Sequence, residues 1–395
     1  MKILAVCQFY YPENFVITNI CEAMVKQGHD VTVLTGQPNY GYNQIIPGYE
    51  KIRYEEINGV KVHRVKLVPR KQTRLSIIRN YLSFWKHSKK WVKKCKEEFD
   101  IVYSMSISPV TILSAGNLYK KKHHVKHVVH CVDLWPESVL VTHAVRKHSL
   151  MYRLLYRWSY KLYEKVDHVI IGSPSFKKYF EDVLKLGDKK MTYIPQPSLV
   201  ESTDLAPYKY DKGFNILYCG NLGSIQLIEL IPEAMKLIKD EDVRFHIIGM
   251  GARTEYIQNK IKEYHLEDKL IYHGPIPAKK AASYFLEADS LYVSLKDEGF
   301  VGKTIPNKLV MYMTFARPII AMLGGDGREV LKDSKGAILC EETPESLANA
   351  IKEMKKLSKE EKEKLGHNNQ VYYKKHFSID VVSKDIVEVL LSELK

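Results

Sequence analysis

The segment HCVDLWPES, residues 130–138, brings together side chains that could take part in chemistry. His130, Asp133 and Glu137 follow or end the β-branched run VKHVVH, which is typical of a buried strand. In an open α/β sheet, the polar groups at the end of such a strand line the ligand site. We therefore predict a catalytic site at His130, Asp133 and Glu137. The structural alternative makes Asp133 an N-cap of the following turn and Trp135 a packing residue.

Two glycine-containing loops in the second half of the chain could bind a phosphate. CGNLGS (219–224) separates a predicted strand from a helix, and GMGART (249–254) places Arg253 after a partial G-x-G. Glycines at such a turn let backbone N–H groups approach a phosphate at the positive end of a helix. Two alternatives stay open, a plain turn and a dehydrogenase-type site, although the third glycine of the dinucleotide fingerprint is missing.

A lysine in the first turn of a predicted helix is a further candidate for phosphate binding. In GFVGKTIPNKLVMYM (299–313) a glycine-rich loop leads into Pro306, a residue suited to a helix start, and then to Lys308. The helix dipole disfavours a cation there unless an anion neutralises it. Lys308 is therefore a candidate diphosphate ligand. The alternative is an exposed lysine on a surface helix.

Residues 74–96, RLSIIRNYLSFWKHSKKWVKKCK, are predicted to form a basic amphipathic helix. Apolar residues recur with helical spacing at 75, 78, 82, 85, 92 and 95, and no acidic residue occurs between Glu56 and Glu97. Such a helix suits an anionic membrane surface. The alternative is a core-facing apolar stripe with a solvated basic face, and the sequence leaves both open.

Four histidines in HHVKHVVH, at 123, 124, 127 and 130, suggest a zinc site as a further alternative. Within a strand, however, His127 and His130 point to opposite faces, and no nearby acid or cysteine completes a ligand set. We therefore expect no metal site.

Length, charge and cysteine content narrow the class of protein. A chain of 395 residues with 45% hydrophobic and 27% charged residues predicts a globular protein of two domains. Residues 1–198 carry 32 Lys and Arg against 16 Asp and Glu, or +16, which leaves −2 of the total +14 for residues 199–395. One domain is therefore expected to face an anionic surface or ligand. The six cysteines lack C-x-x-C spacing and are expected to be reduced. No stretch approaches the ~20 apolar residues of a membrane span.

Strand-like and helix-like segments alternate along the chain. This rhythm predicts an α/β protein of two tandem Rossmann-like, doubly wound domains that face each other across a cleft. A proline-containing linker at 193–213 separates domains at 1–198 and 199–375, and a C-terminal helix at about 376–395 is expected to pack back on the first. The start of the chain is interpreted as the first strand rather than a signal peptide. Strands are predicted at 2–8, 31–35, 99–105, 125–132, 168–173, 214–220, 244–251, 269–274, 290–295, 317–322 and 337–340.

These pieces together resemble the retaining glycosyltransferases of family 4, which have the two-domain GT-B fold. The similarity is greatest to the branch that assembles bacterial capsule, exopolysaccharide or O-antigen repeat units. DLWPES and IP-x-K-x-x-x-YM are the specific elements. The resemblance covers essentially the whole chain, through QFYYPENF, LTGQPNYGYN, HCVDLWPES, YCGNLG, IIGMG, ADSLYVSL, TIPNKLVMYM and ARPIIAM in the family's order.

The resemblance implies transfer of a sugar, with retention, from a nucleotide-diphosphate sugar to a saccharide linked to a lipid diphosphate. The donor is expected to be a UDP-sugar, and no metal, other cofactor or nucleic-acid partner is expected. The enzyme would lie at the cytoplasmic face of the plasma membrane and contact it peripherally through residues 74–96. His130 and Asp133 would orient the substrate rather than attack it. Donor-binding roles are implied for Gly220, Asn221, Gly223, Gln226, Arg253, Ile276, Glu298, Thr304 and Lys308, and acceptor-side roles for Tyr11, Glu13, Asn14 and Tyr40.

Two departures from the family pattern concern the donor. Met311 stands where many relatives have a glutamate that holds the ribose hydroxyls, and methionine cannot accept those hydrogen bonds. Asn221 and Gln226 stand where many have arginine and lysine, so the diphosphate contacts are expected to rest on Arg253 and Lys308. Two other functions are considered, a GT-B-type sugar-nucleotide epimerase and a basic nucleic-acid-binding protein. The latter lacks a recognisable nucleic-acid fold around the basic helix.

Overall fold

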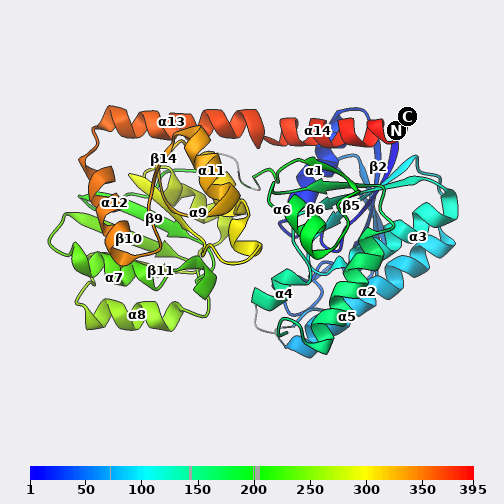
Figure 1. Ribbon diagram of the computed structural model, residues 1–395, viewed down its shortest axis with the longest axis horizontal. Helices are drawn as coiled ribbons and strands as arrows, with labels where there is room; N and C mark the ends of the chain where they lie inside the picture. The colour runs from blue at the N-terminus through cyan, green and yellow to red at the C-terminus, as the bar shows by residue number, and fades with distance from the viewer. Residues whose placement is uncertain (72, 142–144, 199, 201–204) are drawn as a thin grey trace. The chain divides into compact units, whose positions relative to one another are not determined.

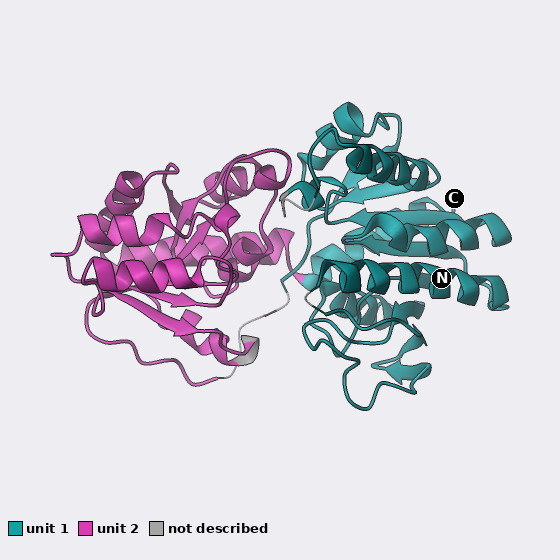
Figure 2. Ribbon diagram, turned by 90° about the horizontal axis from the view of Figure 1, so that it is seen from below, with its two compact units in different colours: residues 1–199, 379–395 teal, residues 200–378 magenta. Residues whose placement is uncertain are grey.

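The computed structural model describes residues 1–395 except 72, 142–144, 199 and 201–204, and the side chains of residues 141, 278 and 279 are also left out. The chain divides into two compact units, which we call unit 1 (residues 1–199 and 379–395) and unit 2 (residues 200–378) (Figure 2). The expected domain boundary at 198/199 and the centre of the expected linker fall on residues outside the described part.

Unit 1 is built on an eight-stranded sheet with the order β3-β4-β2-β1-β5-β6-β7-β8 (Figure 1). All neighbouring strands are parallel except β3 and β4. The strands are β1 (Lys2–Val6), β2 (Asp30–Gly36), β3 (Tyr54–Ile57), β4 (Val60–Val65), β5 (Ile101–Ser106), β6 (Lys126–Cys131), β7 (His168–Ile171) and β8 (Lys190–Tyr193). The helices are α1 (Val16–Lys26), α2 (Arg74–Lys94), α3 (Leu113–His123), α4 (Glu137–Val141), α5 (Leu150–Tyr163), α6 (Phe176–Lys178) and α14 (Ile379–Ser392).

The sheet of unit 1 is buried on both faces because alternate residues of a strand point to opposite sides. Ile3 of β1 belongs to a buried cluster with residues of α1 and α14. Its neighbour Leu4 belongs to a different cluster, with Phe84 of α2 and Tyr119 of α3. Helices therefore cover both faces and leave the strand ends and the connecting loops to form sites.

Three strands of unit 1 were not predicted. β3 and β4 form an antiparallel hairpin at one edge, joined by Asn58 and Gly59, both with positive φ (50° and 80°). An Asn-Gly pair is the usual sequence signal of such a turn, so this hairpin could have been found. β8 is a short edge strand before the proline-containing segment, where periodicity is too brief to detect.

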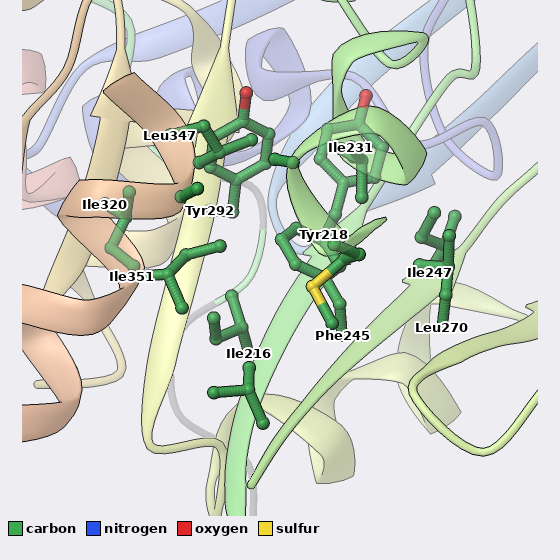
Figure 3. Close-up of a cluster of buried hydrophobic side chains, with 14 of the residues drawn as sticks. Ile216, Tyr218, Ile231, Phe245, Ile247, Leu270, Tyr292, Ile320, Leu347 and Ile351 are labelled. Atoms are coloured by element: carbon green, nitrogen blue, oxygen red, sulfur yellow. The ribbon is translucent and has the colours of Figure 1, made fainter. Parts of the chain in front are cut away.

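Unit 2 has a six-stranded, fully parallel sheet with the order β11-β10-β9-β12-β13-β14. Ile216 and Tyr218 of β9 pack with Ile231 and Ile351 on one face, as Figure 3 shows, and Leu217 faces a second cluster with Phe285. The strands are β9 (Phe214–Cys219), β10 (Val243–Ile248), β11 (Leu270–Gly274), β12 (Ser290–Ser294), β13 (Ile319–Met322) and β14 (Ala337–Leu339). The helices are α7 (Leu230–Leu237), α8 (Thr254–Glu263), α9 (Ala278–Phe285), α10 (Asn307–Met313), α11 (Gly325–Ser334), α12 (Pro344–Lys356) and α13 (Lys359–His376).

Helix α14 follows α13 in sequence but belongs to unit 1. Its Ser383 accepts a hydrogen bond from Gln27 (2.8 Å), at the end of α1. Near its C-terminal end, the buried Glu393 carboxylate lies 3.1 Å from both His168 Nδ1 of β7 and Lys190 Nζ of β8. Each unit is a doubly wound α/β domain, as the alternation of segments predicted.

Candidate functional site

The loops after β9 and β10 in unit 2 touch through glycines. Gly220 has φ +154°, and a side chain there would meet Lys308, whose Cε would lie 2.6 Å from an added Cβ. Gly249 has φ +138°, and an added Cβ would overlap the carbonyl oxygen of Gly220. The backbone conformation favours glycine at both positions, and at Gly249 the backbone of Gly220 also leaves no space for a side chain. The two loops therefore form one close-packed edge, which we call the glycine edge (residues 219–224 and 249–253).

Lys308, in the first turn of α10, lies against the glycine edge. Its Nζ is buried, has no hydrogen-bond partner among the residues that the structure describes, and lies 3.6 Å from the centre of the Tyr218 ring. Burial lowers the pKa of Lys308 to about 7. A buried ammonium group without a partner is costly, so an anion that accepts its hydrogen bonds would be stabilised here.

Arg253 lies on the other side of the same turn. Its backbone N–H donates to the carbonyl oxygen of Leu222 (2.9 Å), which fixes the start of α8 beside the first loop. The Nε of Arg253 is also buried, and no described residue accepts a hydrogen bond from it. Two cationic side chains with unsatisfied donors therefore lie against the turn between Gly220 and Leu222.

Asn221, Gly223 and Gln226 form a small group on the same turn. Asn221 Nδ2 lies 3.4 Å from Gln226 Oε1, and an added Cβ at Gly223 would contact both side chains. The hydroxyl of Tyr218 donates to the carbonyl oxygen of Asn221 (2.6 Å). The uncharged pair thus packs over Gly223, and the cationic groups at this edge come from Lys308 and Arg253.

The loops after β11 and β12 reach the same edge of the sheet. Lys296 donates its backbone N–H to Ile225 (2.8 Å), which brings the segment 296–304 beside the glycine edge. Within that segment Glu298 is exposed and pairs with the Lys296 side chain (2.5 Å), and the Thr304 hydroxyl donates to Val301 (2.9 Å). Ile276 is partly buried and follows β11, whose Gly274 carbonyl accepts from Gly249 (2.9 Å). All predicted donor-side residues therefore lie in the segments that follow the carboxyl ends of the unit 2 strands or, for Lys308, in the first turn of α10 beside those segments.

Two tyrosines that the sequence analysis did not single out position this edge. Tyr218 supplies the ring beneath Lys308. The Tyr312 hydroxyl, fully buried, lies 2.9 Å from the backbone nitrogen of Cys219 and 3.2 Å from its carbonyl oxygen, and so ties α10 to the end of β9. Met311, beside it, packs on the hydrophobic cluster. Both tyrosines stand in motifs of the resemblance, Tyr218 in YCGNLG and Tyr312 in IP-x-K-x-x-x-YM, so those motifs were the signal that could have found them.

In unit 1 the prediction that the His130 side chain reaches the substrate needs correction. The side chain is fully buried, with Nδ1 3.1 Å from the Tyr103 hydroxyl and Nε2 3.1 Å from the carbonyl oxygen of Ile194. Burial lowers its pKa to about 4, so the ring is neutral. His130 is on β6 before the strand ends, and its ring therefore holds neighbouring strands together instead of reaching a substrate. His127 is likewise bonded at both nitrogens, to Ser104 and Asn117, which argues against the zinc alternative.

Asp133 lies beyond the end of β6 and keeps a candidate role. Its carboxylate accepts a hydrogen bond from the Ser108 hydroxyl (2.6 Å), and that hydroxyl is 2.8 Å from Ser138. Burial raises the pKa of Asp133, although the two serines act in the opposite direction. The carboxyl is thus held in place by the loop after β5 and by the first turn of α4.

Glu137 opens α4, and its carboxylate accepts a hydrogen bond from the Tyr152 hydroxyl of α5 (2.6 Å). This contact joins two helices, so the structure gives Glu137 a positioning role that the sequence did not indicate.

The predicted acceptor-side residues fall into two groups. Tyr11, Asn14 and Tyr40 are exposed at the loops after β1 and β2. Glu13, in contrast, is buried, and its Oε1 accepts the backbone N–H groups of Asn39 (2.7 Å) and Tyr40 (2.6 Å). Its carboxylate therefore organises the loop that carries Tyr40, and the acceptor-side role of Glu13 stays a prediction.

The predicted basic helix is α2, and part of its apolar stripe faces outward. Leu75, Ile78 and Leu82 are exposed, whereas the buried face carries Asn80, Ser83, Phe84, Ser88 and Val92. On α5, three more apolar side chains are exposed, Leu150, Met151 and Leu154. Trp85 of α2 contacts Trp158 of α5 (ring centres 6.2 Å apart), so these rows lie on neighbouring helices (Figure 1). None of the helices in the described part is both long and apolar enough to cross a membrane.

Comparisons with known proteins agree with this architecture. The family described as Glycosyltransferase Family 4 matches residues 14–197, and Glycosyl transferases group 1 matches residues 213–356. The probable glycosyltransferase WbjE of Pseudomonas aeruginosa is 26% identical over a stretch that spans 57% of this chain and 57% of that protein. The putative colanic acid biosynthesis glycosyl transferase WcaI of Escherichia coli is 23% identical over 78% of this chain and 80% of its own length.

Among solved structures, Anabaena Alr3699/HepE in complex with UDP matches 99% of this chain and 100% of its own, with a TM-score of 0.69 and 14% identity. That likeness shows the fold, which is GT-B. The two family matches together span most of both units, with their order along the chain preserved. The chain therefore belongs to the family 4 glycosyltransferases.

Proposed function

We propose that this protein transfers a sugar, with retention of configuration, from a UDP-sugar to a lipid-diphosphate-linked saccharide in bacterial surface polysaccharide synthesis. Unit 2 binds the donor, and unit 1 binds the acceptor. The curated relatives are glycosyltransferases, and one is named for colanic acid biosynthesis, which supports the assignment to polysaccharide synthesis. A similar fold that binds UDP supports the choice of nucleotide.

The observation that carries this proposal is the pair of unsatisfied cationic donors at the glycine edge. Lys308 Nζ and Arg253 Nε are both buried without partners, beside a turn in which Gly220 leaves room for close approach. A diphosphate would accept these hydrogen bonds and gain charge stabilisation as the sugar departs. Lys308 and Arg253 then neutralise the leaving group, and the proposal needs no metal for that step.

On the acceptor side, Asp133 is the residue we assign to orienting the accepting hydroxyl. Its carboxyl is fixed by Ser108 and lies beyond the end of β6. The exposed rings of Tyr11 and Tyr40 follow the carboxyl ends of β1 and β2 in the same sheet. Because the His130 ring is fully bonded inside the sheet, we assign it no direct contact with substrate.

Peripheral membrane contact is part of the same proposal. Six exposed apolar side chains of α2 and α5 form what we call the apolar face (Leu75, Ile78, Leu82, Leu150, Met151 and Leu154). Basic residues of the same helices flank it, among them Arg74, Arg79 and Arg153. Apolar side chains with a basic rim suit the surface of an anionic bilayer, where a lipid-linked acceptor resides.

The test is a transfer assay with a panel of UDP-, dTDP- and GDP-sugars, lipid-linked saccharide acceptors and EDTA. We expect one UDP-sugar to be consumed only in the presence of acceptor, with the same anomeric configuration in the product. Absence of both nucleotide-sugar binding and transfer across the panel would reject the proposal. Conversion of the donor without acceptor would instead indicate an epimerase.

A further inference from the structure

Arg70, in the loop between β4 and α2, is held between two aromatic rings. Its guanidinium carbon lies 5.0 Å from the centre of the Tyr40 ring and 5.6 Å from that of Tyr81. One terminal nitrogen donates to the Tyr81 hydroxyl (3.1 Å). Contact with two aromatic rings and the hydrogen bond to Tyr81 restrict the position of the guanidinium and leave its remaining N–H donors available.

A second arginine nearby shows what a purely structural role looks like. Arg64 of β4 is buried, pairs with Glu55, and donates to the carbonyl oxygen of Tyr11 (2.5 Å). Arg70 is only partly buried, and within the described part of the chain it forms no ion pair with a carboxylate. Its charge is therefore oriented by its neighbours but not neutralised by them.

A buried polar network holds this arrangement in place. Asn39, fully buried, accepts the backbone N–H of Arg70 (2.8 Å) and a hydrogen bond from Asn80 (3.1 Å). Asn80 also donates to Val68 (2.6 Å), in the same loop as Arg70. Glu13 fixes the backbone of Tyr40, as described above. Buried polar groups are costly unless they are satisfied, so this network fixes the backbone of Arg70 and of Tyr40, which carry the cation and one of the rings beside it.

The site lies near the predicted catalytic carboxyl. Burial raises the pKa of Tyr81, and the charge of Asp133 raises it further while Arg70 lowers it. Tyr81 thus lies within electrostatic range of both Arg70 and Asp133. Arg70, Tyr40 and Asp133 all follow the carboxyl ends of strands in one sheet.

We propose that Arg70 binds a phosphate of the lipid-linked acceptor. Tyr40 and Tyr81 hold the guanidinium in position, and its remaining N–H donors can form two parallel hydrogen bonds to phosphate oxygens. The inference rests on the proposed function and adds the group that recognises the acceptor's diphosphate. The saccharide end would then extend from Arg70 toward Asp133.

The experiment measures binding of farnesyl diphosphate, of neutral farnesol and of inorganic pyrophosphate by calorimetry, with UDP saturating so that the donor side is occupied. Arg70→Ala is compared with the full-length wild-type chain, with Arg70→Lys, and with Arg53→Ala. Arg53 is an exposed arginine of unit 1 whose side chain bonds to the backbone carbonyls of Glu50 and Ile52. Thermal unfolding of each variant shows that it is folded.

We expect Arg70→Ala to weaken farnesyl diphosphate binding about tenfold to a hundredfold and to leave farnesol binding unchanged. Arg70→Lys should show part of that loss, and Arg53→Ala none. No wild-type binding of farnesyl diphosphate, an equal loss for both lipids, or equal affinity for inorganic pyrophosphate would overturn the inference. If the Arg70→Ala variant transfers sugar as fast as the wild type, this site is rejected but the proposed function is not. If the wild type transfers no sugar at all, the proposed function itself is rejected.

Discussion

At the scale of single residues, Lys308 combines a burial that destabilises its charge with a position at the glycine edge. In the free protein its pKa is lowered to about 7, and a diphosphate binds the protonated form. Of the titratable groups facing it, the Tyr218 hydroxyl has a pKa raised well above its usual value by burial, and burial raises the pKa of Cys219 to about 11. Neither therefore changes charge near neutral pH.

UDP-sugar affinity should accordingly be highest below pH 7 and fall as the pH rises from about 7 to about 8.5, by up to about tenfold per pH unit. Lys308→Met should weaken binding about tenfold to a hundredfold at about pH 6.5 and remove the pH dependence. Calorimetric titration with a UDP-sugar, whose diphosphate keeps its charge over this range, measures both. An unchanged affinity in the variant would mean that another cation holds the diphosphate.

Asp133 is the second residue whose role can be separated by substitution. Asp133→Asn keeps the shape and can still bond to Ser108, but it removes the charge. We expect kcat to fall by about 10- to 100-fold while the KM for the donor stays within about twofold, because the proposed donor site is in unit 2. Wild-type kinetics in this variant would leave Asp133 a structural residue of the turn.

At the scale of elements, the glycine edge depends on the close approach of two loops. Gly249→Ala would place a methyl group on the carbonyl of Gly220, in a backbone conformation that alanine rarely adopts. We expect loss of UDP-sugar binding and destabilisation of unit 2 by at least ~3 kcal/mol.

Gly274→Ala is the matched control, because Gly274 also has positive φ (73°) but an added Cβ would meet no atom within 4 Å. Its cost should be only the backbone strain of about 1–2 kcal/mol, with binding retained. Denaturant unfolding and UDP-sugar titration of the pair check both statements. Equal behaviour of the two variants would show that the contact between the loops is unimportant.

The apolar face of α2 and α5 should govern membrane binding. Ile78, Leu82 and Leu154 are already exposed, so replacing all three by serine removes apolar surface from this face without opening the core. Co-sedimentation with vesicles that contain anionic lipid should fall about tenfold or more, while stability changes little. Serine at Leu237 and Val371, exposed apolar residues of unit 2, provides the control. If the variant binds vesicles as well as the wild type does, the apolar face is not the membrane-binding surface.

At the scale of the whole molecule, the two units have separate cores, and α14 completes the first of them. Glu393 joins α14 to β7 and β8. Burial alone would raise the pKa of Glu393, but its hydrogen bonds with His168 and Lys190 outweigh burial and lower that pKa. A carboxyl whose pKa is lowered in the folded state stabilises it above the unfolded pKa, near 4.5, and loses that contribution as the pH falls through the folded pKa.

Glu393→Gln should therefore lower the unfolding temperature of unit 1 at about pH 7 and have a smaller effect near pH ~4. A UDP-sugar should raise the transition of unit 2, because a ligand stabilises the unit that binds it. Scanning calorimetry of the full chain resolves both. A shift of equal size at both pH values would contradict the role of the Glu393 charge.

The features that could be predicted from the sequence are those whose signals lie within a few neighbouring residues. The strand-helix alternation and the glycine loops were readable because periodicity and turn chemistry act over a few residues. Lys308 and Arg253 were predicted from their places beside those loops, and the structure brings both to one turn. The Asn58-Gly59 hairpin was local too and could have been found.

Other features depend on contacts between distant segments. His130 was predicted to face a substrate, but its ring is sealed by Tyr103 and by Ile194, 64 residues away. Glu13 became a loop anchor because Asn39 and Tyr40 fold over it. Arg70 belongs to no motif. The phosphate-binding role that we propose for it depends on contacts of its guanidinium with Tyr40 and Tyr81, which are distant in sequence from each other.

The sequence by itself determined most of the order of strands and helices, the family and the residue types available for binding a diphosphate. The tertiary structure decided which of those polar groups form hydrogen bonds in the interior and which keep unsatisfied donors. The physical reason is that a side chain's hydrogen-bond partners are set by neighbours far along the chain, while its propensity for a strand, helix or turn is set by neighbours close by.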